Sequence, residues 1–240
     1  MSASDPLPPE AVAPPPGPPA LTQGWRDVVF LHWSVDPDLV APLLPPGTRP
    51  DVLAGSTYVG VVAFGVAYTR VLGAVPTGGF DEANVRLYAR DRNGRQGVVF
   101  LTMDADSAHN VLAGRALARV PYIWSDVAVR TAGGQAVGGV RRRAPGPPAR
   151  ARWRVAVGAP IARPSPLERF VTARWGLFTT WFGATAWIPV AHPPWPLHSA
   201  WVLRYEGDLV AAAGVALPDR PPESALWSPG VATGFYLPRR

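Results

Sequence analysis

FDEANVRLYARDRNGRQGVVFLTMDAD, residues 80–106, is the stretch that decides the fold. Two runs rich in β-forming residues flank Asn93-Gly94, a pair typical of the tight turn of a β-hairpin. We therefore expect residues 80–90 and 96–106 to form two antiparallel strands. A chain organised around such a hairpin favours an antiparallel sheet over a parallel one.

The first strand of this hairpin carries polar groups at every second position. Successive side chains of a β-strand point to opposite faces, so the polar groups share one face while Ala83, Val85 and Leu87 share the other. The polar face is either a wetted surface or the floor of a site. It offers an acid or base, an amide, a cation and a hydroxyl, supplied by Glu82, Asn84, Arg86 and Tyr88.

The rest of the chain predicts more strands and a few helices. Strands are expected at residues 25–33, 56–71, 122–130, 136–143 and 150–157, and again in the last part, which contains residues 191–207 and 209–217. Helices are expected after Asp36, from Ser107 or Asp106 to about Arg119, and from Pro166 to about Phe182. Many strands joined by tight turns, with two or three helices, indicate an α+β, mostly antiparallel or barrel-like fold.

Composition predicts one folded domain, residues 21–240, after a tail. Residues 1–20 contain eight prolines and few large apolar side chains, so we expect them to be disordered. They lack the basic start and apolar run of a signal peptide, and no later segment has 18 consecutive apolar residues. We expect a soluble, cytoplasmic protein that does not bind membranes, and homo-oligomers remain open.

Charge and residue usage exclude several kinds of chemistry. The net charge is +6, but the arginines at 141, 142, 143, 150, 152 and 154 account for all of it. Such a span is typical of a solvated loop and an edge strand, so we expect no nucleic-acid partner. All 23 basic residues are arginine, which excludes a lysine Schiff base. Cysteine is absent. The chain also has no phosphate-binding loop, so we expect no cofactor.

Two arginines fall where helical periodicity predicts burial. Arg115 lies four and three residues after Val111 and Leu112, and Arg174 lies four residues from both Phe170 and Phe178. A buried guanidinium needs an anion or several acceptors. Each is therefore a substrate clamp, a structural partner of a carboxylate such as Asp104, Asp106 or Glu82, or a side chain that reaches water.

Two histidines are also candidates. His32 shares a strand face with Val28 and Phe30, so it is either a hydrogen-bonded core residue or an acid-base group. His192 and Trp195 lie in the rigid loop AHPPWPLH, where they either pack locally or close over a cavity. No histidine pair has the spacing of a zinc motif, so we expect no metal.

The ordered set FLHWSVDPDLVAPLLPPG, FDEANVRLYAR, GVVFLTMDAD, VPY, FVTARWGLF and HPPWPL resembles the YqjF-like family of uncharacterised bacterial proteins. The resemblance extends from about Trp25 to at least His198. It implies the fold of the acetoacetate decarboxylase-like superfamily: a bent antiparallel sheet closed into a cone-shaped barrel, with two or three helices outside and a ligand cavity inside. The decarboxylase uses a lysine, which is absent here, and Glu82 could correspond to one of its glutamates.

Three functional hypotheses follow. In the first, the protein is a lysine-independent lyase or isomerase acting on a small oxo-acid or polyketide-like molecule, with Glu82, His32 and Tyr88 as catalytic groups. Its substrate-binding residues are then Asn84, Arg86, Arg115, Arg174, His192 and Trp195. In the second, the same residues only orient an anionic small-molecule ligand. In the third, the proline-rich tail and the basic hairpin bind a protein partner.

Overall fold

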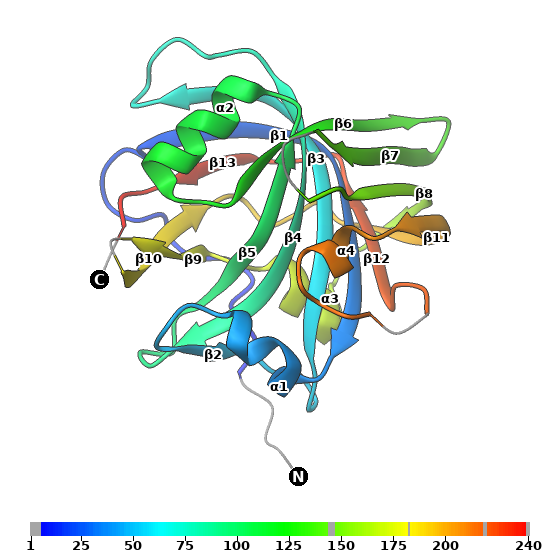
Figure 1. The fold of residues 1–240 in the computed structure, drawn as a ribbon, viewed down its shortest axis with the longest axis horizontal. Coiled ribbons are helices and arrows are strands. Elements are labelled where there is room, and N and C mark those ends of the chain that lie inside the picture. Colours follow the sequence, from blue (N-terminus) through cyan, green and yellow to red (C-terminus); the bar gives the residue numbers. More distant parts are fainter. Residues whose placement is uncertain (1–5, 144–146, 182, 218–219, 239–240) are drawn as a thin grey trace.

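The computed structural model describes residues 6–143, 147–181, 183–217 and 220–238 (Figure 1). Their strands form one large, mostly antiparallel sheet, in which β5 pairs in parallel with β6 and with β9. The strands are β1 (Leu21–Val35), β2 (Thr48–Pro50), β3 (Thr57–Val71), β4 (Phe80–Asp91), β5 (Gln96–Ala105), β6 (Tyr122–Ala132), β7 (Gln135–Arg142), β8 (Arg150–Pro160), β9 (Gly176–Trp181), β10 (Ala184–Ala191), β11 (His198–Gly207), β12 (Ser224–Ser228) and β13 (Ala232–Phe235).

The helices of the described residues are short. They are α1 (Pro37–Val40), a 3₁₀ turn η1 (Ala41–Leu43), α2 (Ala108–Ala113), a π turn η2 (Gly114–Ala118), α3 (Pro166–Thr172) and α4 (Leu209–Ala212). None of them is long and apolar enough to cross a membrane.

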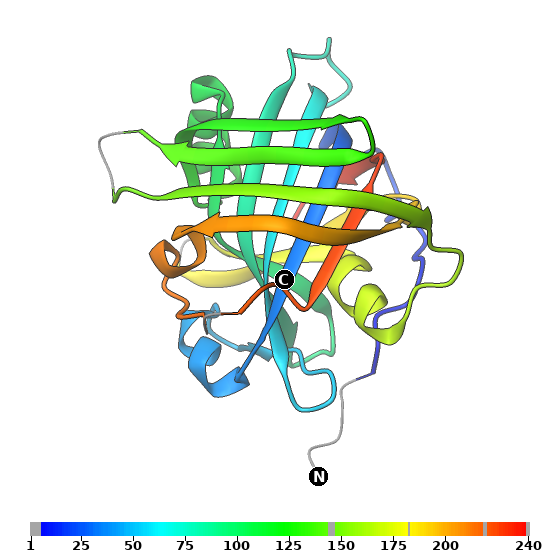
Figure 2. The ribbon, with the colours of Figure 1, turned by 90° about the vertical axis from the view of Figure 1, so that its right-hand side faces the viewer.

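The sheet branches at both ends of a four-stranded wall made of β1, β3, β4 and β5. One branch runs from β5 through β6, β7, β8, β11 and β12 back to β1. The other runs from β5 through β9, β10 and β13 back to β1. Two rings of strands therefore share the wall, and in Figure 2 β6, β7, β8 and β11 cross in front of β1 and β3.

The wall separates two interiors because its side chains alternate. Val85 and Leu87 of β4 join a packed apolar cluster with β6, β7 and β8. Tyr88, on the opposite face of β4, joins a second cluster with α3, β9 and β10. Both faces of β4 are thus buried, and its polar face is an interior one rather than a wetted surface.

The predicted hairpins and two predicted helix starts are confirmed. β4 and β5 pair antiparallel around a turn in which Gly94 has φ +80°. Asp36 caps α1 through the Asp38 amide, and Ser165 caps α3 in the predicted capping box with Glu168. Helix caps can be predicted from the sequence because the two hydrogen-bonding partners lie within three residues of each other.

The helix predicted from Pro166 to about Phe182 is wrong beyond Thr172. Residues 176–181 form strand β9, which pairs with β5 and β10. Gly176 lies against the Trp187 ring, where an added Cβ would come within 2.3 Å of ring carbon Cε2. Apolar residues that suit a helical stripe also suit a buried strand, and here the sheet pairing decides. Phe182 lies outside the described residues.

Two predictions for later segments are also wrong. Residues 209–212 form helix α4 instead of a strand. The basic span is not an edge, because β8 pairs with both β7 and β11. Arg142 is buried and forms two hydrogen bonds with Asp104, at 2.8 and 3.1 Å. Residues 144–146 of this span lie outside the described residues.

The described part of the proline-rich segment, residues 6–20, forms no helix or strand but contacts the body of the protein. The Pro6 carbonyl accepts hydrogen bonds from Arg90 and Gln96, both at 3.0 Å. The Pro9 carbonyl accepts one from the Trp175 indole at 2.8 Å. Leu7 packs against the cluster beside α3.

Candidate functional site

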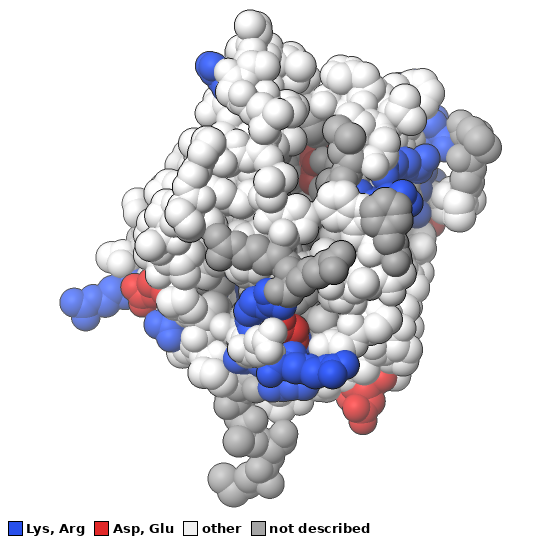
Figure 3. Space-filling model, turned by 90° about the vertical axis from the view of Figure 1, so that its left-hand side faces the viewer, with Lys and Arg blue, Asp and Glu red and all other residues white. Residues whose placement is uncertain are grey.

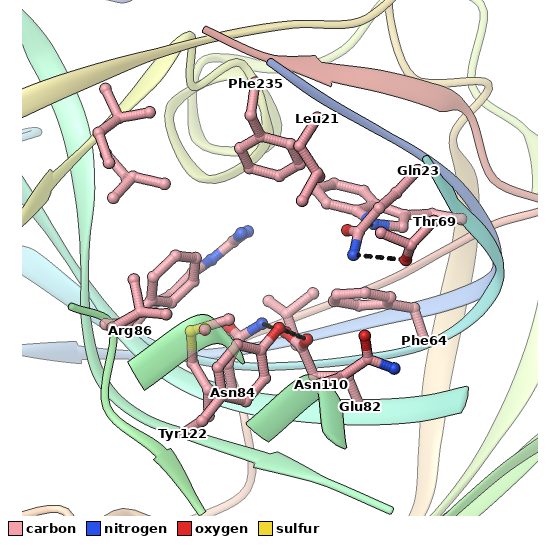
Figure 4. A pocket seen from close by; sticks show the side chains of 18 of the residues that line it. Leu21, Gln23, Phe64, Thr69, Glu82, Asn84, Arg86, Asn110, Tyr122 and Phe235 are labelled. Atoms are coloured by element: carbon pink, nitrogen blue, oxygen red, sulfur yellow. Dashed lines mark hydrogen bonds between the residues drawn. The ribbon is translucent and has the colours of Figure 1, made fainter. Parts of the chain in front are cut away.

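The second interior contains a cavity of about 350 Å³. Its walls come from the polar face of β4, the facing residues of β1, β3 and β5, the α2 region, β9, β10 and the segment after β13 (Figure 4). Most of these side chains are apolar. The polar side chains among them, apart from the indoles, are Gln23, Thr69, Glu82, Asn84, Arg86, Asn110, Tyr122 and Tyr236.

Glu82 is the acid of this cavity. Its side chain comes from β4 and is buried, with the residue 2% exposed. Oε2 accepts a hydrogen bond from the Tyr122 hydroxyl at 2.6 Å, and Oε1 accepts one from Asn84 Nδ2 at 3.2 Å. Burial raises the pKa of the carboxyl to about 7, and the nearby charge of Asp104 adds to this rise against the opposing effect of the two hydrogen bonds. Both protonation states are therefore populated near neutral pH.

Arg86 is the cation of the cavity, and Figure 4 shows its guanidinium pointing into the open space. Nε donates to the Tyr88 hydroxyl at 3.1 Å, and a terminal nitrogen donates to the Val171 carbonyl at 3.1 Å. Both acceptors are neutral. Within the described residues no carboxylate pairs with Arg86, so its charge is available to an anionic ligand.

Asn84 lies between these two groups on the same face of β4. Its Nδ2 donates to Glu82, but its Oδ1 is buried and accepts no hydrogen bond from the described residues. A buried carbonyl oxygen without a donor costs about 1–3 kcal/mol. A ligand hydroxyl or amide that donates to Asn84 Oδ1 would recover this energy.

His32 and Tyr88 lie behind Arg86 and do not line the cavity. His32 Nε2 and the Tyr88 hydroxyl are 2.6 Å apart, and that hydroxyl donates to the Val171 carbonyl at 3.0 Å. Gly60 permits this contact, since an added Cβ would be 2.6 Å from His32 Nε2. Burial, and then the charges of Arg86 and Arg174, lower the pKa of His32 well below its ordinary value, so the ring is neutral.

Arg174 is buried, but it lies between α3 and β9 rather than on a helix. Its guanidinium binds Asp51 and donates from Nε to the Phe170 carbonyl at 2.7 Å. Asp51 also binds Arg90 at 3.1 Å. Arg174 therefore takes the structural role that the sequence left open, with a carboxylate partner other than the three named from the sequence.

Arg115 does not point inward as the helical periodicity predicts. It is exposed on the π turn η2, where Nε donates to the Tyr122 carbonyl at 2.6 Å. Leu112, assigned to the same apolar side, is also exposed. The short α2 helix and the change to π geometry after residue 113 rotate these side chains away from the expected face.

The rigid loop after β10 closes the end of the cavity near Arg86. Trp195 lines the cavity, stacks on Trp25 at 5.9 Å and donates to the Thr172 carbonyl at 3.1 Å. His192 does not line it. Its ring stacks on Trp175 at 4.6 Å, and burial lowers its pKa.

Sequence reasoning missed several cavity residues. Tyr122 belongs to the VPY motif, but nothing in that motif names Glu82 as its partner 40 residues away. Gln23 on β1 donates a hydrogen bond to the Thr69 hydroxyl on β3 at 3.2 Å. Asn110 comes from α2, and Phe235 and Leu237 come from the end of the chain. Only long-range pairing brings these segments together.

No three histidine, cysteine, aspartate or glutamate side chains are grouped as metal ligands in the described ranges. The donor set of the cavity itself is one carboxyl group and neutral polar groups beside an arginine.

Comparison with known proteins fits this architecture. A model of the DUF2071 family, described as an uncharacterized conserved protein, matches residues 22–232. The chain belongs to this family. Within the curated proteins it is 29% identical over 208 residues to the uncharacterized protein YqjF of Bacillus subtilis (strain 168), covering 84% of this chain and 85% of YqjF. The family resemblance predicted from the sequence is confirmed.

Two solved structures show that the fold is that of acetoacetate decarboxylase-like enzymes. The acetoacetate decarboxylase of Legionella pneumophila has a TM-score of 0.62 and 13% identity, covering 92% of this chain and 86% of its own. The enduracididine biosynthesis enzyme MppR, in complex with pyruvate, has a TM-score of 0.59 and 17% identity, covering 93% and 90%. These neighbours bear out the predicted mostly antiparallel, bent sheet.

Proposed function

We propose that this protein binds a small anionic carbonyl compound in the cavity and catalyses proton transfer at the carbon beside the carbonyl. The reaction is that of a lyase or isomerase that uses no lysine. The proposal rests on two groups that line the same cavity. Glu82 is a carboxyl group with a pKa of about 7, and Arg86 has no carboxylate partner among the described residues. A base with a pKa near the working pH is effective in both directions of proton transfer.

Each group has a defined role. In an isomerase reaction, ionised Glu82 takes the proton from the carbon beside the carbonyl, and the electron pair of that C–H bond forms an enolate. Protonated Glu82 then returns the proton to a different atom of the enolate, which completes the isomerisation. In a lyase reaction on a 3-oxo acid, the bond to the carboxyl carbon breaks, CO₂ leaves, and protonated Glu82 gives its proton to the carbon of the enolate. Arg86 stabilises the negative oxygen, and Tyr122 and Asn84 hold Glu82 in place.

The neighbouring structures support the choice of first compounds. One is an acetoacetate decarboxylase and another was solved with pyruvate, so oxo-acids are the class to test. This chain contains no lysine, so any such chemistry here relies on acid-base and electrostatic groups alone.

The test is exchange of carbon-bound protons with solvent. Pyruvate and acetoacetate are incubated with the protein in D₂O, and ¹H NMR follows the loss of the signals beside the carbonyl. We expect catalysed exchange that Glu82→Gln abolishes while ligand binding is retained. Glu206→Gln, at an exposed glutamate, is the matched control and leaves the rate unchanged. Exchange at the wild-type rate in Glu82→Gln would contradict the proposal.

A second candidate is a binding protein without catalysis. It is favoured by the two hydrogen bonds that Glu82 already accepts within the protein, which occupy both of its oxygens. In that case oxo-acids bind, Arg86→Met abolishes binding, and proton exchange stays at the uncatalysed rate. The hypothesis of a partner-binding basic hairpin has less support, because Arg142 pairs with Asp104 and both Arg141 and Arg143 pair with Asp126.

A further inference from the structure

The two charged groups of the cavity, Glu82 and Arg86, lie toward one end. The β1–β3–β4 register gives the order of its levels along the wall: Gly60 lies opposite Arg86, Phe64 opposite Glu82, and Leu21 opposite Val71 at the far end. The first two levels are four residues apart on one strand, about 13 Å along the backbone. Arg86 is therefore at the end near α3, Glu82 is further along, and Leu21 and Val71 lie at the other end.

The polar pair beyond Glu82 has no obvious role in binding. Gln23 donates to Thr69 at 3.2 Å and accepts from the Trp25 indole at 2.9 Å, so its oxygen and one amide hydrogen are already bonded within the protein. The group with an unfilled buried acceptor is Asn84, and the cation without a carboxylate is Arg86. A ligand's polar end is thus recognised at the inner end of the cavity.

The outer end of the cavity is apolar and continues into an apolar rim. Leu21, Val71, Phe235 and Leu237 line the walls there. Leu237 itself is largely exposed, and two more exposed aliphatic residues, Leu72 and Leu112, are chain neighbours of lining residues; we call these three residues the rim. Val71 and Ala113 line the cavity. Leu72 directly follows Val71 in the chain, and Leu112 directly precedes Ala113.

Two exposed arginines stand near the rim in the chain: Arg70, two residues before Leu72, and Arg115, three residues after Leu112. Figure 3 shows the face that carries α2 and the chain end, and its charged side chains lie mostly along the lower edge and one side. Exposed apolar side chains that continue an apolar cavity wall extend the surface that an apolar ligand can contact. A small polar acid would leave both the outer cavity and this rim without contacts.

We propose that the ligand is amphipathic: a carboxylate with an unbranched or lightly branched apolar chain that lies along the cavity and leaves it through the rim. The anionic end binds Arg86, the carbon beside the carbonyl lies at Glu82, and the chain contacts Phe64, Leu21 and Phe235. This inference rests on the proposed function of the same site and adds the apolar chain.

Chain length separates the two claims. Isothermal titration calorimetry with butanoate, hexanoate, octanoate and decanoate should show affinity rising about fourfold per added methylene, as expected from the roughly 0.8 kcal/mol that burial of one methylene contributes. Equal affinity from butanoate to decanoate, lost in Arg86→Met, overturns the amphipathic ligand and leaves the proposed anion site standing. No binding by any of the four acids overturns the amphipathic ligand, and the proposed function is overturned as well if pyruvate and acetoacetate also fail to bind.

A pair of matched variants locates the apolar chain. Leu237 is 73% exposed at the rim, and Leu39 is 69% exposed on α1, outside the cavity lining. Leu237→Asp should weaken decanoate at least fivefold and leave butanoate unchanged, while Leu39→Asp changes neither. Thermal unfolding of both variants verifies that they fold. Decanoate affinity unchanged in folded Leu237→Asp would overturn the proposed exit through the rim.

Discussion

The two interiors on either side of the wall are built by the same strands, yet one is filled and the other is hollow. On one face of β4, Val85 and Leu87 pack with β6, β7 and β8. On the other face, Glu82, Asn84 and Arg86 line a cavity of about 350 Å³. A strand with period two can therefore serve a packed core and a polar site at once, provided that a second ring of strands encloses the polar face.

The hollow interior also contains two classes of charge. At its closed end Asp51 pairs with both Arg90 and Arg174, whereas Arg86, one level closer to the open space, has neutral acceptors. This contrast separates charges that stabilise the fold from a charge that is available to a ligand.

The largest effect is expected from breaking the ion pairs of Asp51. Asp51→Asn leaves Arg174 buried without its carboxylate and removes one partner of Arg90, which should lower the free energy of unfolding by about 3–5 kcal/mol. Arg86→Met is the matched variant and should cost less, because Arg86 has no carboxylate partner among the described residues and loses only hydrogen bonds to two neutral acceptors. Urea unfolding gives both values, and equal losses would remove the distinction between the two classes.

The next effect compares the filled and the hollow interior directly. Leu87→Ala creates a void in a packed cluster and should cost about 3 kcal/mol. Leu177 is also buried but lines the existing cavity, so Leu177→Ala only enlarges it and should cost at least about 1 kcal/mol less. Denaturant midpoints measure both, and a larger loss for Leu177→Ala would mean that the cavity is not open.

A pH-dependent effect is expected at Glu82. Its pKa is about 7 in the folded protein against 4.5 when unperturbed, so the folded state holds this proton over a range where the unfolded state has lost it. Wild-type stability should therefore fall as pH rises from 4.5 to 7, by roughly 3 kcal/mol from this group. Glu82→Gln removes this dependence, so its stability relative to the wild type should rise between pH 4 and pH 8. A constant difference across that range argues against the raised pKa.

The smallest effect is expected from the N-terminal segment, whose residues Pro6, Leu7 and Pro9 contact the hollow side. Deleting residues 1–10 removes the carbonyl acceptors of Arg90, Gln96 and the Trp175 indole and should cost about 1–2 kcal/mol. Hydrogen exchange should increase near α3 and β9 but not in β7. Equal exchange on both sides of the wall would show that the segment does not act locally.

Features of this fold that depend on neighbouring residues could be predicted from the sequence. Features that depend on pairing between strands far apart in the chain could not. The alternation in β4, the turn at Gly94 and the caps at Asp36 and Ser165 depend on neighbours within a few residues. The helix expected beyond Thr172 failed because an apolar run suits either element until β5 and β10 supply its partners.

The same distinction holds for the site. The sequence placed Glu82, Asn84 and Arg86 on one face, and the structure puts that face in the cavity. It did not reveal Tyr122, which arrives from β6, or the packing of His32 behind Arg86. Residues that meet only after the rings form leave no periodic signal in the chain.

The central claim is that Glu82 is a buried carboxyl group that exchanges its proton near neutral pH beside an available arginine. The most direct measurement is a ¹³C NMR titration of carboxyl-labelled glutamate, with the Glu82 signal assigned by its loss in Glu82→Gln. With five glutamates in the chain, the spectrum is simple. The signal should titrate with a pKa of about 7, and it should shift when a carboxylate ligand is added. Titration near 4.5, with no response to any carboxylate, would contradict the account.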